Sequence, residues 1–162
     1  MILQTPRLNL RKFKPVDLPS LIDLFADPEV MKYIGPRRAM TAAESREWLL
    51  NILDQQAHEL TRFAVALQES DELIGVAGLR EEDGVKDFGY YFRRSSWGKG
   101  YAQEACAAIL DYIENTLHIT EYQVFIADEN IHSIRMIERV GLQAGEAIIK
   151  SGEHGHLYQR NF

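Results

Sequence analysis

The chain has 162 residues, of which 46% are hydrophobic and 26% are charged, and this profile predicts one globular domain with a single core. Its 18 basic and 24 acidic residues give a net charge of −6 at pH 7, which argues against a nucleic-acid partner and mildly favours a cationic substrate. The single cysteine, Cys106, excludes an internal disulfide. Because there is no N-terminal leader pattern and no long apolar run, we expect a cytoplasmic protein that does not enter a membrane.

The first third of the chain carries one strand signal and two helix signals. Residues 7–11 alternate polar and apolar side chains, which predicts a half-buried strand. Apolar residues recur at helical spacing over 18–25, and a second apolar turn follows at 30–34. Thr41 and Glu44 have the spacing of a capping box, so a second helix is expected to begin there.

From residue 61 the apolar pattern changes to a period of two. Strands are expected at 63–67 and 73–79, and Asp83-Gly84 is typical of a tight hairpin turn into a third strand at 88–94. A helix with one apolar face is expected after Gly100. This middle part therefore reads as an antiparallel meander that runs into a helix.

The last third predicts a strand, a helix and two more strands. The strand covers 122–127, and the helix covers 133–140 and ends at Gly141. The final two strands are expected at 143–150 and 156–161.

The segment between the meander and its helix contains Gly98, Lys99 and Gly100. A glycine-bearing turn before a helix presents backbone N–H groups and the positive end of the helix dipole to an anion, usually a phosphate. The alternative is a tight turn with only a conformational role. A dinucleotide fingerprint is excluded because its third glycine is replaced by Gln103, and no P-loop run exists.

Five segments in order resemble the GNAT superfamily of acetyl-CoA-dependent N-acetyltransferases, and within it the RimJ/RimL-like branch: "TPRLNLRKF", "DPEV", "TAAESREWL", "WGKGYAQEA" and "NIHSIRMIERVGL". The resemblance implies a single domain over residues 1–162 with an α/β (α+β) fold. Its central sheet would be mixed and mainly antiparallel, with about seven strands, flanked by helices and split in the middle where acetyl-CoA enters. The implied reaction is direct transfer of acetyl to a primary amine in a ternary complex, without a metal.

The resemblance also implies the residues that hold the cofactor. Strand residues 92–94 would pair with the pantetheine arm, and the amides of 98–102 would hold the pyrophosphate. Ser95 departs from the Gln or Arg that usually opens this motif, which leaves the backbone contacts. Trp97 and Tyr101 either pack around the turn or line the groove. The full implied set is Phe92, Arg93, Arg94, Trp97, Gly98, Lys99, Gly100, Tyr101, Ala102, Asn130 and Ser133.

The chemistry requires a proton for the leaving thiolate. Many family members use a tyrosine on the helix after the strand that follows the glycine helix, and here Ile137 stands in that place. Asn130 and Ser133 match the N-x-x-S pattern of the RimJ/RimL-like branch. There the asparagine contacts the pantetheine and the serine is the proposed proton donor. The alternative is that both residues cap a helix, and the two roles are compatible.

The chemistry also requires a group that takes a proton from the amine. Glu81, Glu82 and Asp87 flank the hairpin beside the expected acetyl site, and Asp87 comes first because it lies on the strand itself. The alternative for all three is solvated surface charge. A polyamine would suit the acidic net charge, and a protein N-terminus would suit the resemblance. Exposed sheet edges make a homodimer plausible.

The remaining reactive residues are expected to be structural. Cys106 is interpreted as a buried thiol rather than a nucleophile. His154 to His156 is interpreted as a turn rather than a metal site. We expect the arginines Arg7, Arg11, Arg37 and Arg38 to be solvated charges. Two other functions stay open, a noncatalytic acyl-CoA-binding or regulatory module and a purely structural domain.

Overall fold

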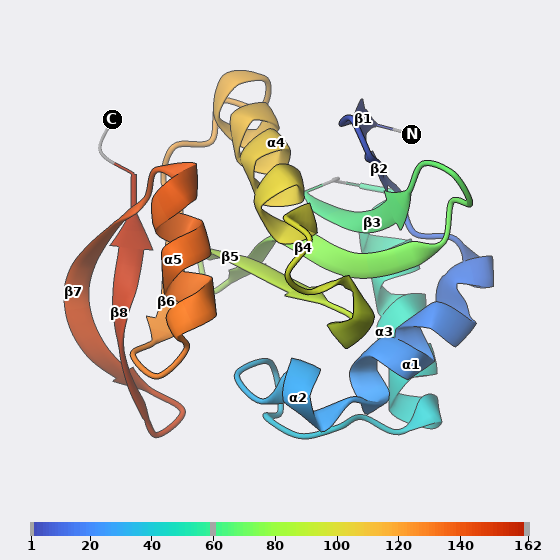
Figure 1. Cartoon of the computed structure of the whole chain (residues 1–162), viewed down its shortest axis with the longest axis horizontal. Coiled ribbons are helices and arrows are strands. Elements are labelled where there is room, and N and C mark those ends of the chain that lie inside the picture. Colours follow the sequence, from blue (N-terminus) through green and yellow to red (C-terminus); the bar gives the residue numbers. More distant parts are fainter. Residues whose placement is uncertain (1, 59–60, 161–162) are drawn as a thin grey trace.

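The computed structural model describes residues 2–58 and 61–160, and these residues form two antiparallel sheets (Figure 1). The larger sheet has the order β1-β2-β3-β4-β5 and the smaller has the order β6-β8-β7. The described ranges hold eight strands where about seven were expected, because the short β1 next to β2 was not predicted. The strands are β1 (Leu3–Gln4), β2 (Leu8–Arg11), β3 (Arg62–Leu67), β4 (Leu73–Glu82), β5 (Val85–Phe92), β6 (Val124–Ala127), β7 (Gln143–Lys150) and β8 (Glu153–Gln159).

Helices cover both faces of the larger sheet, and the alternation of side chains along β3 explains how. Phe63 and Val65 belong to the core that contains α4 and α5, whereas Ala64 belongs to the core that contains α1, α2 and α3. The expected α/β fold with a mainly antiparallel sheet is therefore confirmed (Figure 1). The helices are α1 (Leu18–Ala26), α2 (Pro28–Met31), α3 (Ala42–Gln55), α4 (Tyr101–Asn115) and α5 (Ile131–Val140), with short 3-10 helices η1 (Pro15–Asp17) and η2 (Arg94–Ser96).

Local signals set several element ends as predicted. Thr41 accepts a hydrogen bond from the backbone N–H of Glu44 at 3.2 Å, and the Glu44 carboxylate accepts from the Thr41 N–H at 3.0 Å, so the capping box opens α3. Asp83 and Gly84 both have positive φ, 53° and 78°, which is the geometry of a type I′ hairpin turn. Gly141, at φ 109°, ends α5.

The C-terminal hairpin differs from the prediction. His154 and His156 lie inside β8, because the turn is made earlier by Ser151 and Gly152 at φ 51° and 79°. The interpretation of the histidine pair as a turn is therefore wrong. The last strand begins at residue 153 instead of 156, and residue 161 of its expected range lies outside the described residues. Helix α5 begins at Ile131, two residues before its expected start.

The two sheets meet at one point in the described part of the chain. Asp87 of β5 forms a parallel bridge with Gln123, just before β6. The N–H of Phe88 donates to the Gln123 carbonyl at 2.8 Å, and the Gln123 N–H donates to the Lys86 carbonyl at 3.0 Å. Beyond this bridge, β5 continues beside β4 and β6 continues beside β8. The sheet is therefore split between β5 and β6, as expected.

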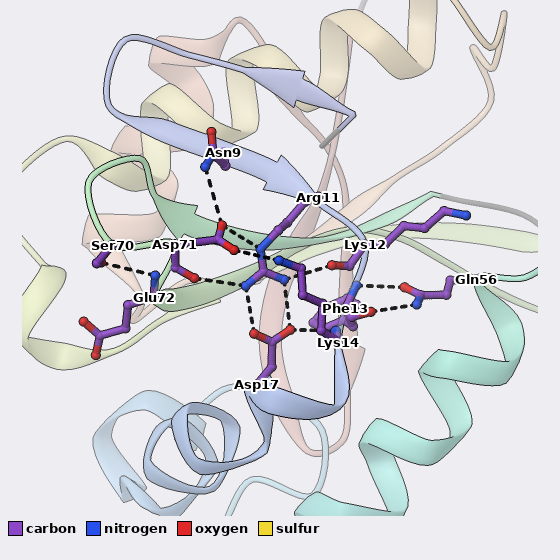
Figure 2. A network of polar contacts seen from close by, with 10 residues as sticks. All are labelled: Asn9, Arg11, Lys12, Phe13, Lys14, Asp17, Gln56, Ser70, Asp71 and Glu72. Atoms are coloured by element: carbon purple, nitrogen blue, oxygen red, sulfur yellow. Dashed lines mark hydrogen bonds and ion pairs between the residues drawn. The ribbon is translucent and has the colours of Figure 1, made fainter.

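A buried ion pair fixes the start of the chain against the larger sheet (Figure 2). Arg11 is only 3% exposed, and its two terminal nitrogens donate to Asp17 at 2.9 and 2.8 Å while its Nε donates to Asp71 at 2.9 Å. Lys14 also donates to Asp71, at 2.7 Å. The interpretation of Arg11 as a solvated charge is therefore wrong, because this guanidinium joins β2, η1 and the turn between β3 and β4.

Candidate functional site

The loop between β5 and α4 makes the turn that the glycines predict. Gly98 and Gly100 have φ values of 75° and 80°, in the left-handed region that favours glycine. Gly100 is the N-cap of α4. Both positions therefore favour glycine because of their backbone conformation, and the turn leads directly into α4.

The same corner presents free backbone donors. The first helical hydrogen bond of α4 runs from the Glu104 N–H to the Gly100 carbonyl at 3.1 Å. In the described ranges, no acceptor is found for the N–H groups of residues 98–103. Lys99 is exposed beside them. A run of unpaired amides at a helix N-terminus with an adjacent cation fits a diphosphate group.

Arg7 holds this loop from outside, which the sequence did not reveal. Its Nη1 donates to the Lys99 carbonyl at 2.8 Å, and its guanidinium carbon lies 4.3 Å from the centre of the Tyr101 ring. Its Nε pairs with Glu104 at 2.8 Å. Burial alone would raise the pKa of Glu104, but hydrogen bonds from Thr5 and Arg7 lower it. Arg7 is thus not merely a solvated charge, and the structure places Tyr101 in packing contact with it.

The edge of β5 that faces the split carries further donors. The Phe88 N–H points toward Gln123, whereas the Arg93 N–H donates to a carbonyl of β4 at 2.9 Å. Because hydrogen-bonding direction alternates along an antiparallel strand, the N–H groups of Tyr90 and Phe92 point the same way as that of Phe88. These two amides lie past the bridge between the sheets. They could pair with an extended ligand arm or polarise a carbonyl oxygen.

Two aromatic residues shape the end of this edge. Trp97 Nε1 donates to the Phe92 carbonyl at 2.8 Å, while Trp97 as a residue stays 48% exposed. Phe92 is buried, and its ring lies against Gly75, where a Cβ would stand only 2.5 Å from a ring carbon. Trp97 therefore folds back onto the strand end and leaves an exposed indole surface next to the loop.

The two arginines after β5 bind acidic side chains of neighbouring segments. Arg93 pairs with Glu72 at 2.6 Å. Arg94 Nε donates to Asp27 at 3.0 Å, and this hydrogen bond lowers the pKa of Asp27. Their side chains therefore anchor the loop to the β3–β4 turn and to the start of α2. The Arg93 N–H is already bonded to β4, so within the described residues the Arg94 N–H is the backbone donor of this pair that is left for a cofactor.

Asn130 and Ser133 lie in the first turn of α5, but the described structure does not show them capping it. Asn130 occupies the N-cap without a side-chain hydrogen bond to the helix. The Ser133 Oγ instead forms a short hydrogen bond with the Tyr90 hydroxyl. The capping role left open by the sequence is therefore not what these side chains do here.

Tyr90 is the polar residue of this site that the sequence reasoning missed. It stands in the middle of β5, its ring centre lies 6.0 Å from that of Phe88, and it packs against the core under α4. Burial raises the pKa of its phenol, so the group stays protonated at neutral pH. The available signal was chemical, since a tyrosine on a core-facing strand position usually needs a hydrogen-bond partner. Ile137, where the family resemblance implies that many members have a tyrosine, is fully buried.

The three candidate bases are not gathered around Ser133. Glu82 pairs with Val85 in register, while Tyr90 pairs with Ala77. Five residues of strand separate Ala77 from Glu82, or about 17 Å. Glu81 lies in the same hairpin, 3.9 Å from Lys86. These two glutamates are therefore remote from Tyr90.

Asp87 is nearer to the centre of the molecule, at the bridge between the sheets. Its Oδ1 accepts a hydrogen bond from the Gln123 side chain at 3.0 Å. It is three residues from Tyr90 along β5, so the two side chains lie on opposite faces of the strand.

Other residues have structural positions. Cys106 is buried, and burial raises the pKa of its thiol, as its interpretation as an unreactive core residue requires. His156 pairs with Asp128 at 2.8 Å. Within the described ranges, no group of three or more His, Cys, Asp or Glu side chains is arranged to hold a metal ion. No helix in the part of the chain that the structure describes is both long and apolar enough to span a membrane.

Comparison with known proteins identifies the family. The model of the acetyltransferase (GNAT) domain matches residues 7–143. The uncharacterized N-acetyltransferase p20 of Bacillus licheniformis is 32% identical over 145 residues, which cover 87% of this chain and 82% of that protein. The crystal structure of a GNAT-family acetyltransferase from Bacillus anthracis matches with a TM-score of 0.81 at 26% identity, over 98% of this chain and 95% of that one.

A more distant structure shares the fold with a cofactor bound. RimL, a ribosomal L7/L12 alpha-N-protein acetyltransferase in complex with coenzyme A, matches with a TM-score of 0.80 at 17% identity, over 97% of this chain and 94% of that one. The family match on this chain includes β5, the glycine corner and the start of α5. The chain therefore belongs to the GNAT family of acetyltransferases, which take the acetyl group from acetyl-CoA.

Proposed function

We propose that this protein transfers an acetyl group from acetyl-CoA to a primary amine by direct transfer in a ternary complex. The observation that carries the proposal is the layout of β5. Unpaired amides fitting a diphosphate follow one end of the strand, and the Tyr90–Ser133 hydroxyl pair lies two residues before that end. A phosphate-binding corner and a proton donor are thus joined by one extended strand edge. Acetyl-CoA supplies an activated thioester there.

In this proposal each group of the chain has one task. The amides of residues 98–102, with Lys99, hold the diphosphate. The backbone at the end of β5, at Phe92 and Arg94, and the side chain of Asn130 hold the pantetheine arm. The N–H groups on the free edge of β5 polarise the carbonyl, and such donors are typically worth about 3 kcal/mol. Ser133 gives a proton to the sulfur.

Asp87 is the proposed proton acceptor for the amine. It lies on the face of β5 opposite to Tyr90, so the two proton transfers take place on opposite sides of the strand. Asp87 and Tyr90 are about 10 Å apart along β5, so in this proposal the amine proton passes to Asp87 through a short chain of waters. An α-amine, with a pKa near 8, needs less help than a polyamine amine, with a pKa near 10.4. The RimJ/RimL-like pattern at Asn130 and Ser133 favours a protein N-terminus or a small amine as acceptor.

Ser133→Ala tests the proposal. We measure acetyl-CoA-dependent thiol release with two amine pools, one of short peptides with free N-termini and one of polyamines and aminoglycosides, and we measure coenzyme A affinity by calorimetry. Removing a general acid typically costs about 100-fold or more in kcat, and the Kd for coenzyme A should change by less than about twofold because the diphosphate corner is untouched. Ser20→Ala on α1 is the matched control.

The buried Ile137 favours one alternative, a noncatalytic acyl-CoA-binding or regulatory module. That protein would bind coenzyme A normally and release no thiol with either pool. A protein that neither binds coenzyme A nor turns over would instead be a structural domain. Full activity in Ser133→Ala would remove Ser133 from the mechanism.

A further inference from the structure

The hydrogen bond between Tyr90 and Ser133 joins two elements that belong to different parts of the fold. Tyr90 is on β5 of the larger sheet, and Ser133 is on α5, which packs with α4 over both sheets. The bond therefore crosses the line along which the sheets separate, beside the free edge of β5. A phenylalanine at position 90 would fill the same space without needing a hydrogen-bond partner. Packing alone therefore does not explain the phenol oxygen of Tyr90.

Either hydroxyl can donate in this hydrogen bond, and the reference acidities of the two groups favour the phenol as the donor. A phenol, with a reference pKa near 10, is a better donor than an aliphatic alcohol. Burial keeps the Tyr90 phenol protonated, so it is a neutral donor and not a base. A serine hydroxyl has one proton and two acceptor lone pairs. When Ser133 accepts from Tyr90, its own proton is left to point at a third atom.

We propose that Tyr90 is a positioning residue that donates to Ser133 Oγ and directs the Ser133 proton toward the sulfur of the leaving thiol. The proposal rests on the function proposed above for Ser133. As the new C–N bond forms and the C–S bond breaks, the sulfur takes the bonding electron pair and the Ser133 proton. The amine nitrogen loses one proton, which restores Ser133 through solvent, so no other reactant is needed.

The surroundings of Ser133 support this assignment. Residues four apart on a helix share a face, so position 137 is the next side chain on the same side of α5. Ile137 is fully buried there and offers no proton. Tyr90 therefore brings a phenol from the sheet to a helix face that carries none of its own.

A double-mutant cycle tests whether Tyr90 acts through Ser133. The variants are Tyr90→Phe, Ser133→Ala and the double variant. Tyr112→Phe is the control, because it removes a tyrosine hydroxyl on α4 and keeps the ring that packs against Phe63. We measure kcat, the KM for acetyl-CoA, the Kd for coenzyme A and the thermal midpoint. Tyr90→Phe should lower kcat about tenfold, the size expected for one lost hydrogen bond, with KM and Kd changed less than about twofold.

The cycle separates positioning from the other roles. In the Ser133→Ala background, Tyr90→Phe should have no further effect on kcat, and Ser133→Thr should keep the dependence on Tyr90 because it keeps the hydroxyl. Equal losses in both backgrounds would overturn the proposal, since Tyr90 would then act independently of Ser133. A matching rise in the Kd for coenzyme A, or a fall in thermal midpoint without a kcat effect, would also overturn it in favour of packing.

The outcome for the unaltered protein keeps the two proposals apart. No thiol release with any amine would refute the proposed function and this inference with it. Turnover that responds to Ser133→Ala but not to Tyr90→Phe would refute only the inference.

Discussion

The ion pair between Arg11 and Asp17 makes a quantitative test of what stabilises the fold. Asp17→Asn keeps the side-chain shape and removes the charge. Both side chains of the pair are 4% exposed, and two hydrogen bonds join them. Breaking a buried pair by removing one partner costs about 3–5 kcal/mol, because the other charge stays buried without compensation. Arg11 retains Asp71 at 2.9 Å, so we expect the lower end, about 3 kcal/mol.

Thermal and urea unfolding measure this loss. For a chain of this size each kcal/mol shifts Tm by about 2–4 °C, so Asp17→Asn should lower Tm by about 6–12 °C. Glu44→Gln is the matched control, since it removes the charge from an exposed arginine pair and keeps an acceptor for the helix cap. We expect the control to leave Tm unchanged, and coenzyme A affinity should be unchanged in both variants. A shift in Asp17→Asn no larger than in the control would refute the reasoning, because the buried pair would then contribute no more than a solvated one.

Three further predictions follow from contacts described above. Arg7→Ala should weaken coenzyme A binding about fivefold, since the loop loses a charged hydrogen bond and a ring contact; an unchanged Kd would show that the loop keeps its shape alone. Gly155→Ala should destabilise the fold by about 1–3 kcal/mol, because the new Cβ would lie 2.4 Å from the Ile126 carbonyl oxygen. Urea unfolding measures the free energy of unfolding, and an unchanged value would show that β6 and β8 move apart enough to accept the methyl group. A hydrogen bond from Lys14 leads in lowering the pKa of Asp71 from 3.8 to about 2, so its stabilising effect is present above about pH 4 and is lost as the pH falls toward 2. Between pH 4 and pH 2, Tm should therefore fall less in Asp71→Asn than in the unaltered protein. An equal fall of Tm in both proteins would contradict this prediction.

The parts of the fold that follow from short-range patterns were predictable from the sequence. Thr41 and Glu44 are three residues apart, and Asp83 and Gly84 are adjacent, so their geometry is decided locally. The helix after Gly100 was predictable because its apolar residues recur at helical spacing and form one face. For the same reason the glycine corner could be placed, and its free amides follow from being the start of a helix.

The contacts that complete the site depend on residues far apart in the chain. Alternation in the expected strand at 88–94 puts Tyr90 on the same face as Phe88, but it cannot show that α5 brings Ser133 to Tyr90 from 43 residues away. Arg11 occupies a polar position of a strand, and alternation alone cannot show that it is buried, because Asp17 reaches it from a separate element and Asp71 lies 60 residues away. A period of two gives the face of a side chain and does not give the element that will cover that face.

The link from Arg7 to the loop before α4 has a consequence for how the binding corner comes into being. Arg7 contacts Lys99 and Glu104, which are 92 and 97 residues further along the chain. These contacts therefore form only when the first strands have packed against the rest of the fold. Local opening of β1 and β2 would release the loop, although neither strand carries a residue proposed to contact coenzyme A. Bound coenzyme A should accordingly slow hydrogen exchange at residues 2–11, which lie outside the loop itself. Ligand affinity thus becomes a report on the attachment of the first strands.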